Sequence, residues 1–152
     1  MTLANLDQVF ACRVPLEALA AAAVAALPAQ HRNTVVIDLV QQVERMAERA
    51  RLGDMEGGFR ANAMLTDILH RECANPILTG LLAQLNKPAL RYRHWAYMQQ
   101  TRMLPMAVEN NRQMVDAIRS GDGRRAESVT RALVRTAWKL TRREFAARPP
   151  VD

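Results

Sequence analysis

Three uncharged polar side chains, Asn62, Thr66 and Asn111, lie at the centres of helical faces that are otherwise apolar. Leaving a buried amide or hydroxyl group without a partner costs about 1–3 kcal/mol, so these groups need hydrogen bonds inside the protein. The partner is one of the other two side chains, a water molecule or a bound molecule. This arrangement is typical of an internal ligand site, and it contains none of the residues that a metal ion would require.

Two further positions belong to this candidate site. Asn111 precedes the turn at residues 121–122 by about 10 residues and Leu133 follows it by about 11, so a rise of 1.5 Å per residue places them level on neighbouring antiparallel helices. Arg13 and Glu17 are four residues apart and project from the apolar face of the first predicted helix. The pattern therefore predicts a polar cluster inside a bundle.

The elements that position these residues are all predicted to be helical. Pro, Gly, Asn and Asp divide the chain into periodic segments, and no alternating segment indicates a strand. The expected fold is an all-α, antiparallel bundle of six to seven helices in a single domain over residues 1–148, followed by a tail at 149–152. The expected helices cover about 6–27 with a kink at Pro15, 34–51, 54–74, 76–86, 88–103, 105–120 and 124–145.

The net charge of +6 raises the question of nucleic-acid binding. Four arginines on the last helix are spaced so that they share one line, and an apolar face lies opposite them. We interpret this line as a solvated outer surface, because no aromatic side chains interleave with it. The arginines are Arg124, Arg131, Arg135 and Arg142, and the apolar face is Ala126, Val129, Leu133, Ala137 and Leu140.

Other function classes receive little support from the sequence. The chain has neither a carboxylate pair nor a nucleophile–base pair at suitable spacing, so we expect no enzyme and no catalytic residue. The apolar run at residues 16–27 includes Glu17 and is too short to span a bilayer. Cys12 and Cys73 are too few for a disulfide scaffold, and reduced thiols are expected. We predict a cytoplasmic protein that does not bind membranes.

The three histidines are expected to lie outside the candidate site. His70 is rotated about 80° from Asn62 around the helix, so a flank or surface position is predicted. His31 should be solvated in a loop. His94 lies among aromatic residues and is assigned to helix packing or a dimer contact.

Three segments resemble the FCD domain, the C-terminal effector-binding domain of FadR-type GntR transcription regulators. The segment containing Arg13, Leu16 and Glu17 resembles the family's R-x-x-L-E opening. Residues 62–66 and 74–78 (NAMLT and ANPIL) are similar to its D-x-x-F-H and G-N-P-L-L segments. Residues 109–122 resemble its E-H-R and D-A-I-x-x-G-D segments. The resemblance extends from about residue 6 to residue 143.

Many members of this family bind a divalent metal through one aspartate and three histidines. The resemblance places Asn62 at the aspartate position and Thr66, Asn111 and Leu133 at the histidine positions. Without a charged ligand, a site for zinc, nickel or manganese is implausible. The resemblance therefore implies a metal-free pocket with no cofactor, in which Arg13 corresponds to the family's effector-facing arginine.

The resemblance implies a ligand-sensing and dimerisation domain of a bacterial GntR-type regulator. A small organic acid or related metabolite would bind Arg13, Asn62, Thr66, Asn111 and Leu133. The expected partners are this small-molecule effector and a second copy in a homodimer, and DNA is reached only through a winged-helix domain that these residues do not supply. The alternative is a stand-alone interaction module, in which the three polar groups bond to one another and fill the pocket.

Overall fold

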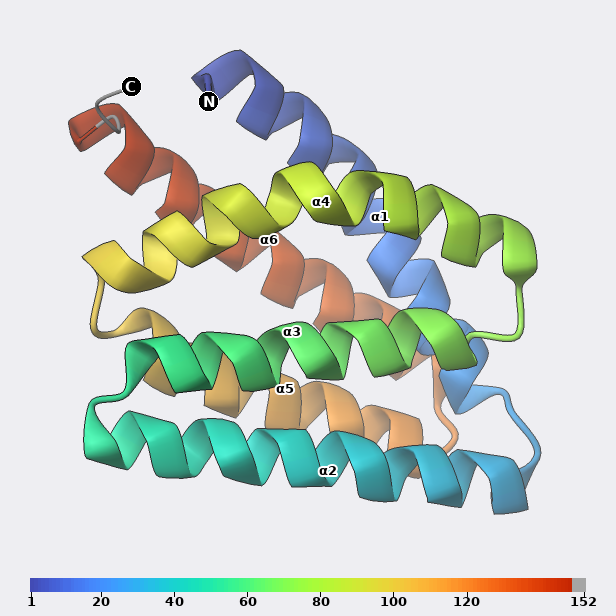
Figure 1. Ribbon diagram of the computed structural model, residues 1–152. Helices are drawn as coiled ribbons and strands as arrows, with labels where there is room; N and C mark the ends of the chain where they lie inside the picture. Colours follow the sequence, from blue (N-terminus) through green and yellow to red (C-terminus); the bar gives the residue numbers. More distant parts are fainter. Residues whose placement is uncertain (149–152) are drawn as a thin grey trace.

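The computed structural model describes residues 1–148, and the predicted tail at 149–152 lies outside the described residues. Residues 1–148 form six helices and no strand, which confirms the all-α prediction. Figure 1 shows them as a bundle. The helices are α1 (Leu3–Ala25), α2 (Ala29–Leu52), α3 (Met55–Glu72), α4 (Pro76–Gln99), α5 (Met103–Arg119) and α6 (Gly123–Ala147).

Polar caps and glycines set the helix ends. At four helix N-termini a side-chain oxygen accepts a hydrogen bond from a free backbone N–H of the first turn. Gly53 ends α2 and Gly121 follows α5, both with the positive φ that glycine adopts without steric cost. These short turns make consecutive helices antiparallel. The four capping residues are Thr2, Asp54, Asn75 and Asp122.

The fourth and fifth predicted segments form one helix, α4, which continues through Pro88. Proline removes one backbone donor and frees the carbonyl of Gln84, but Gln84 is exposed and its carbonyl can bond to water. Leu82 and Ala89 are both buried on either side of Pro88, so packing holds the two halves in one line. The bundle therefore has six helices.

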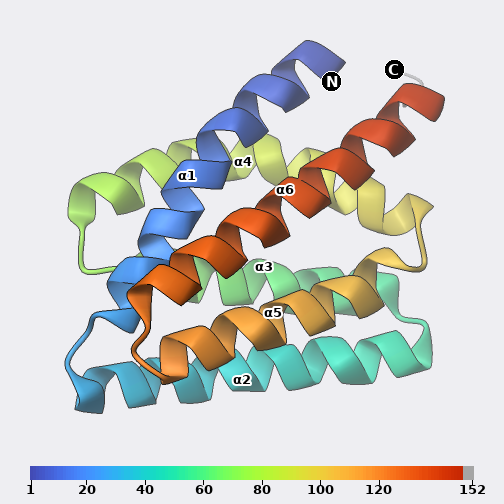
Figure 2. The ribbon, with the colours of Figure 1, turned by 180° about the vertical axis from the view of Figure 1, so that it is seen from behind.

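The helices form two groups in the bundle. In both ribbon views α1 and α6 run antiparallel side by side, and the two ends of the chain lie near each other (Figures 1 and 2). The helix α4 crosses this pair, while α3 and α5 lie between the pair and α2. The helix α2 packs on α3 and α5 and forms an outer layer.

The apolar core has two parts. The larger part extends through α2, α3 and α5, and a smaller part joins the free ends of α1 and α6 to α4 around Phe10, Tyr92 and Phe145. By length and composition α1 could cross a membrane, yet 56% of its most apolar 18-residue stretch is buried inside the bundle. The apolar residues of α1 thus supply much of the core.

Candidate functional site

A cavity of about 50 Å³ lies where the two parts of the core meet. Side chains from α1, α3, α4, α5 and α6 line it, and α2 contributes none of the lining residues. At roughly 10–15 Å³ for each water molecule, the space admits about three to five waters or a compact organic molecule. Apolar walls with a few convergent polar groups are the usual composition of a small-molecule site.

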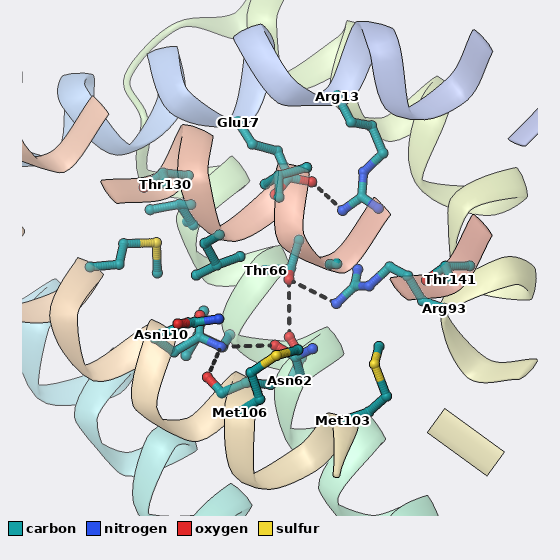
Figure 3. A pocket seen from close by; sticks show the side chains of 18 of the residues that line it. Arg13, Glu17, Asn62, Thr66, Arg93, Met103, Met106, Asn110, Thr130 and Thr141 are labelled. Carbon is teal, nitrogen blue, oxygen red and sulfur yellow. Dashed lines mark hydrogen bonds and ion pairs between the residues drawn. The ribbon is translucent and has the colours of Figure 1, made fainter. Parts of the chain in front are cut away.

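All five sequence-predicted site residues line this cavity. Arg13 comes from α1, Asn62 and Thr66 from α3, Asn111 from α5 and Leu133 from α6. The first four are buried, and Leu133 is partly exposed. Figure 3 shows Asn62, Thr66 and Arg13 pointing into the same space from opposite sides. The separate helices therefore bring the predicted residues together.

The three uncharged polar residues bond to one another and to their surroundings. The Nδ2 atom of Asn62 donates to the Tyr97 hydroxyl at 2.7 Å, and the Thr66 hydroxyl donates to the backbone carbonyl of Asn62 at 3.0 Å. Asn111 donates to the carbonyl of Ala107 at 2.8 Å and, over a longer 3.4 Å, to Oδ1 of Asn62. Mutual hydrogen bonds and an open cavity thus occur together.

Arg13 and Glu17 form a buried ion pair on α1. Burial opposes the ionisation of Glu17, but the positive charge of Arg13, the polar contact with His70 and the charge of Arg93 together outweigh it and hold the pKa of the carboxyl well below its usual range. His70 lies on a flank of α3, as predicted, but not at the surface: it is 6% exposed, and its Nε2 lies 3.7 Å from Oε1 of Glu17. The flank of α3 that carries His70 faces α1 and is therefore interior.

Arg93 on α4 is the main charged residue that the sequence prediction missed. It is 7% exposed and lines the cavity, and its Nη2 donates to the Thr66 hydroxyl at 3.3 Å. Burial, and then repulsion from Arg13, lower the pKa of Arg93 to about 10, so the guanidinium is charged at neutral pH. Its spacing could have indicated this position. Arg93 lies four residues from both Ala89 and Tyr97, and residues four apart lie on the same face of a helix.

The buried line of α6 also differs from the predicted one. Ala126, Thr130, Val134, Thr141 and Phe145 are buried, whereas the predicted residues Val129, Leu133, Ala137 and Leu140 are only partly buried. Because α6 packs on both α1 and α5, its buried line lies between these two helices and is shifted by about one residue from the predicted face. It also brings two threonine hydroxyl groups into the cavity wall, those of Thr130 and Thr141.

Oxygen and nitrogen atoms that form hydrogen bonds line the cavity, but few of its side chains are of the types that bind metal ions. Among residues 1–148, no three His, Cys, Asp or Glu side chains are grouped closely enough to hold a metal ion. The buried arginines would also repel a cation at this position. The chemistry of the lining therefore suits an anion or a hydrogen-bonding organic molecule better than a metal.

Comparisons with known proteins agree with this fold. The chain of Escherichia coli McbR/YncC is similar in structure, with a TM-score of 0.77 and 20% identity over 91% of this chain and 68% of that chain. A search among curated protein sequences found no significant match. A family profile described as the FCD domain matches residues 8–136. Because this match covers most of the sequence, the chain belongs to the FCD domain family.

Proposed function

We propose that this chain is the ligand-sensing and dimerisation domain of a bacterial, cytoplasmic GntR-type transcription regulator, and that it binds a small organic acid without a metal ion. The observation that carries the proposal is the convergence of Arg13, Asn62, Thr66, Asn111 and Leu133 on one cavity. Membership of the FCD family supports the regulatory role. The five helices that meet at the cavity give a ligand contacts with several elements at once.

Such contacts provide a route from ligand to output. A ligand that binds one arrangement of the helices better than another shifts the population toward that arrangement. In a homodimer the shift changes how the two copies sit together, and DNA binding would belong to a separate winged-helix domain. Met103 and Met106 line the cavity, and their flexible side chains can adjust its size to ligands somewhat larger than the present space.

A thermal-shift screen of short organic acids tests this proposal. At ten times its Kd a ligand stabilises the fold by about 1.4 kcal/mol, which raises Tm by about 3–6 °C for a chain of this length. Asn111→Leu removes cavity hydrogen bonds and Leu133→Trp fills the space, so both should reduce the shift. Arg135→Ala, an exposed change on α6, is the matched control. Acids that stabilise all four proteins equally would contradict the proposal.

A stand-alone interaction module is the second candidate. The hydrogen bonds from Asn62 to Tyr97 and from Thr66 to Asn62 favour it, because they satisfy polar groups without any ligand. This module would bind no organic acid and would still pair with another copy or another regulator. Native mass spectrometry distinguishes the candidates, since it reports the oligomeric state and any retained small molecule together.

A further inference from the structure

The charges around the cavity do not balance. Four ionisable side chains line it: Arg13, Glu17, Arg93 and Tyr97. Burial raises the pKa of Tyr97 to about 12, so its hydroxyl is neutral at pH 7. Two guanidinium groups therefore face one carboxylate, which leaves the enclosed space with one positive charge in excess.

The excess positive charge belongs to Arg93, because the charge of Arg13 is balanced by Glu17 on the same helix. Arg13 bonds to Glu17 and lies over the Phe10 ring, with its guanidinium carbon 5.2 Å from the ring centroid. Arg93 forms no ion pair within residues 1–148, and its Nη2 has only the neutral Thr66 hydroxyl as a partner. Its Nη1 atom is buried and has no hydrogen-bond partner in the described part of the chain.

Other cavity groups are also without partners. Nη1 of Arg13 and the hydroxyls of Thr130 and Thr141 are buried, and nothing in residues 1–148 bonds to them. Figure 3 shows the guanidinium groups of Arg13 and Arg93 directed toward each other across the space beside Thr66. An acceptor placed between them would satisfy donors on α1 and α4 together.

We infer that Arg93 supplies the charge that binds the ligand, and that the ligand class is a compact monocarboxylate. The carboxylate accepts from Nη1 of Arg93 and from Nη1 of Arg13, whose own charge Glu17 already balances. The guanidinium thus contributes a fixed positive charge of the kind that a metal ion would otherwise bring. This inference rests on the proposed function and narrows its ligand to a single negative charge.

The size of the cavity limits the rest of the ligand. If each non-hydrogen atom takes the room of one water molecule, a space of about 50 Å³ accepts about three to five of them, as in acetate or propionate. Leu65, Leu69 and Met103 form apolar wall beside the polar groups, which suits a short alkyl chain. A dicarboxylate would bury a second negative charge that no free cation balances, so it should bind more weakly.

Nuclear magnetic resonance titration of the whole chain tests the inference with sodium acetate and sodium propionate at constant ionic strength in chloride buffer. The side-chain amides of Asn62 and Asn111 lie in the cavity wall and report binding there. We expect both acids to shift these signals with millimolar Kd values. Acetamide and propionamide should bind at least tenfold more weakly, because they carry no negative charge. Malonate should also bind more weakly, because it brings a second negative charge and is larger than the space.

Variants of Arg93 separate charge from packing. Arg93→Met should weaken acetate and propionate binding at least tenfold, and Arg93→Lys should lie between it and the wild type, because it keeps the charge but loses the planar fork. Arg91→Met, an exposed change on the same helix, should stay within twofold. A dispersed spectrum for each variant establishes that it is folded, and Arg93→Lys provides a second test if Arg93→Met is not.

The outcomes distinguish this inference from the proposed function. If acetate and propionate bind Arg93→Met within threefold of the wild type, Arg93 is not the anchor and the inference is overturned. If malonate binds the cavity best, the inference is also overturned, while the proposed function, which requires only an organic acid, stands. If a neutral amide binds best, the inference is overturned and the proposed acid ligand is contradicted as well. If no organic acid in the wider thermal-shift screen binds, both are overturned.

Discussion

Asn111 on α5 donates to Oδ1 of Asn62 on α3 across 3.4 Å, whereas Asn62 donates to the Tyr97 hydroxyl across 2.7 Å. The first distance is near the limit for a hydrogen bond and the second is short, so the two contacts differ in strength. The network is therefore tight between α3 and α4 and loose between α3 and α5. A ligand acceptor can replace the loose contact at little cost.

Double-mutant cycles should reproduce this difference. We expect Asn62→Leu and Asn111→Leu each to lower the free energy of unfolding by about 1–3 kcal/mol, since each leaves buried polar groups unpaired. The coupling between Asn62 and Asn111 should be below about 0.5 kcal/mol, and the coupling between Asn62→Leu and Tyr97→Phe should exceed it. Urea unfolding measures all variants, and the reverse order of couplings would contradict the assigned network.

The Glu17 carboxylate should make stability depend on pH in the acidic range. Its pKa in the folded chain is below the ordinary value of 4.5, so the ionised group stabilises the fold above that pH. This contribution is lost as the pH falls below 4.5 toward the folded-state value. The groups that cause it are Arg13 on the same helix, His70 on α3 and Arg93 on α4.

Glu17→Gln tests this dependence. At pH 7 it should cost about 3–5 kcal/mol, because it leaves Arg13 buried without its counter-charge. The difference from the wild type should shrink at pH 3, where the wild-type carboxyl loses part of its advantage. Glu127→Gln breaks the more exposed pair with Arg131 at the same four-residue spacing and should cost less than about 1 kcal/mol. A pH-independent difference for Glu17→Gln would exclude an ionised Glu17.

The positions of the predicted site residues followed from helical periodicity and turn chemistry. Asn62 and Asn111 interrupt apolar stripes, and the turn at Gly121 sets the height of Leu133 relative to Asn111. These are local properties, so the sequence alone was sufficient to place them on helix faces. The family resemblance then identified which faces meet.

Arg93 and His70 escaped prediction for a different reason. An isolated helix pattern treats a charged side chain at the edge of an apolar stripe as solvated, and only the crossing of another helix makes it interior. Once buried, His70 lies beside Glu17 of α1, and Arg93 bonds to the Thr66 hydroxyl of α3. Such contacts between elements depend on how α1, α3 and α4 cross, which periodicity along one helix does not specify. The predicted break at Pro88, which α4 does not show, had the same origin.

Loss of a threonine hydroxyl should raise the free energy of unfolding at two positions in the cavity wall and lower it at a third. The hydroxyls of Thr130 and Thr141 are buried and accept or donate no hydrogen bond within residues 1–148. Replacing either by valine should raise the free energy of unfolding by about 0.5–2 kcal/mol, because a desolvated polar group is removed. Thr66→Val should lower it by about 1 kcal/mol, since that hydroxyl bonds to Asn62 and Arg93.

Urea unfolding of the ligand-free variants measures these changes. Equal effects at all three threonines would contradict the assigned hydrogen bonds. If the two unpaired hydroxyls serve the ligand, Thr130→Val or Thr141→Val should also weaken acid binding while it stabilises the free protein. Residues kept for binding often reduce stability in this way.

Two helical glycines provide a matched test of the packing around the site. Gly80 lies on α4 with open space where a Cβ atom would be, and Gly58 lies on α3 where a Cβ would overlap the side chain of Leu104. Gly80→Ala should stabilise the fold by about 0.5–1 kcal/mol through helix propensity alone. Gly58→Ala gains the same propensity but must displace the fully buried Leu104, so we expect a net loss of about 1–3 kcal/mol.

The two differences in unfolding free energy should therefore have opposite signs, and stabilisation by Gly58→Ala would show that α3 and α5 are farther apart than described. Because Asn62 lies one turn after Gly58, the same displacement should shift the side-chain amide signal of Asn62, which Gly80→Ala should leave unchanged.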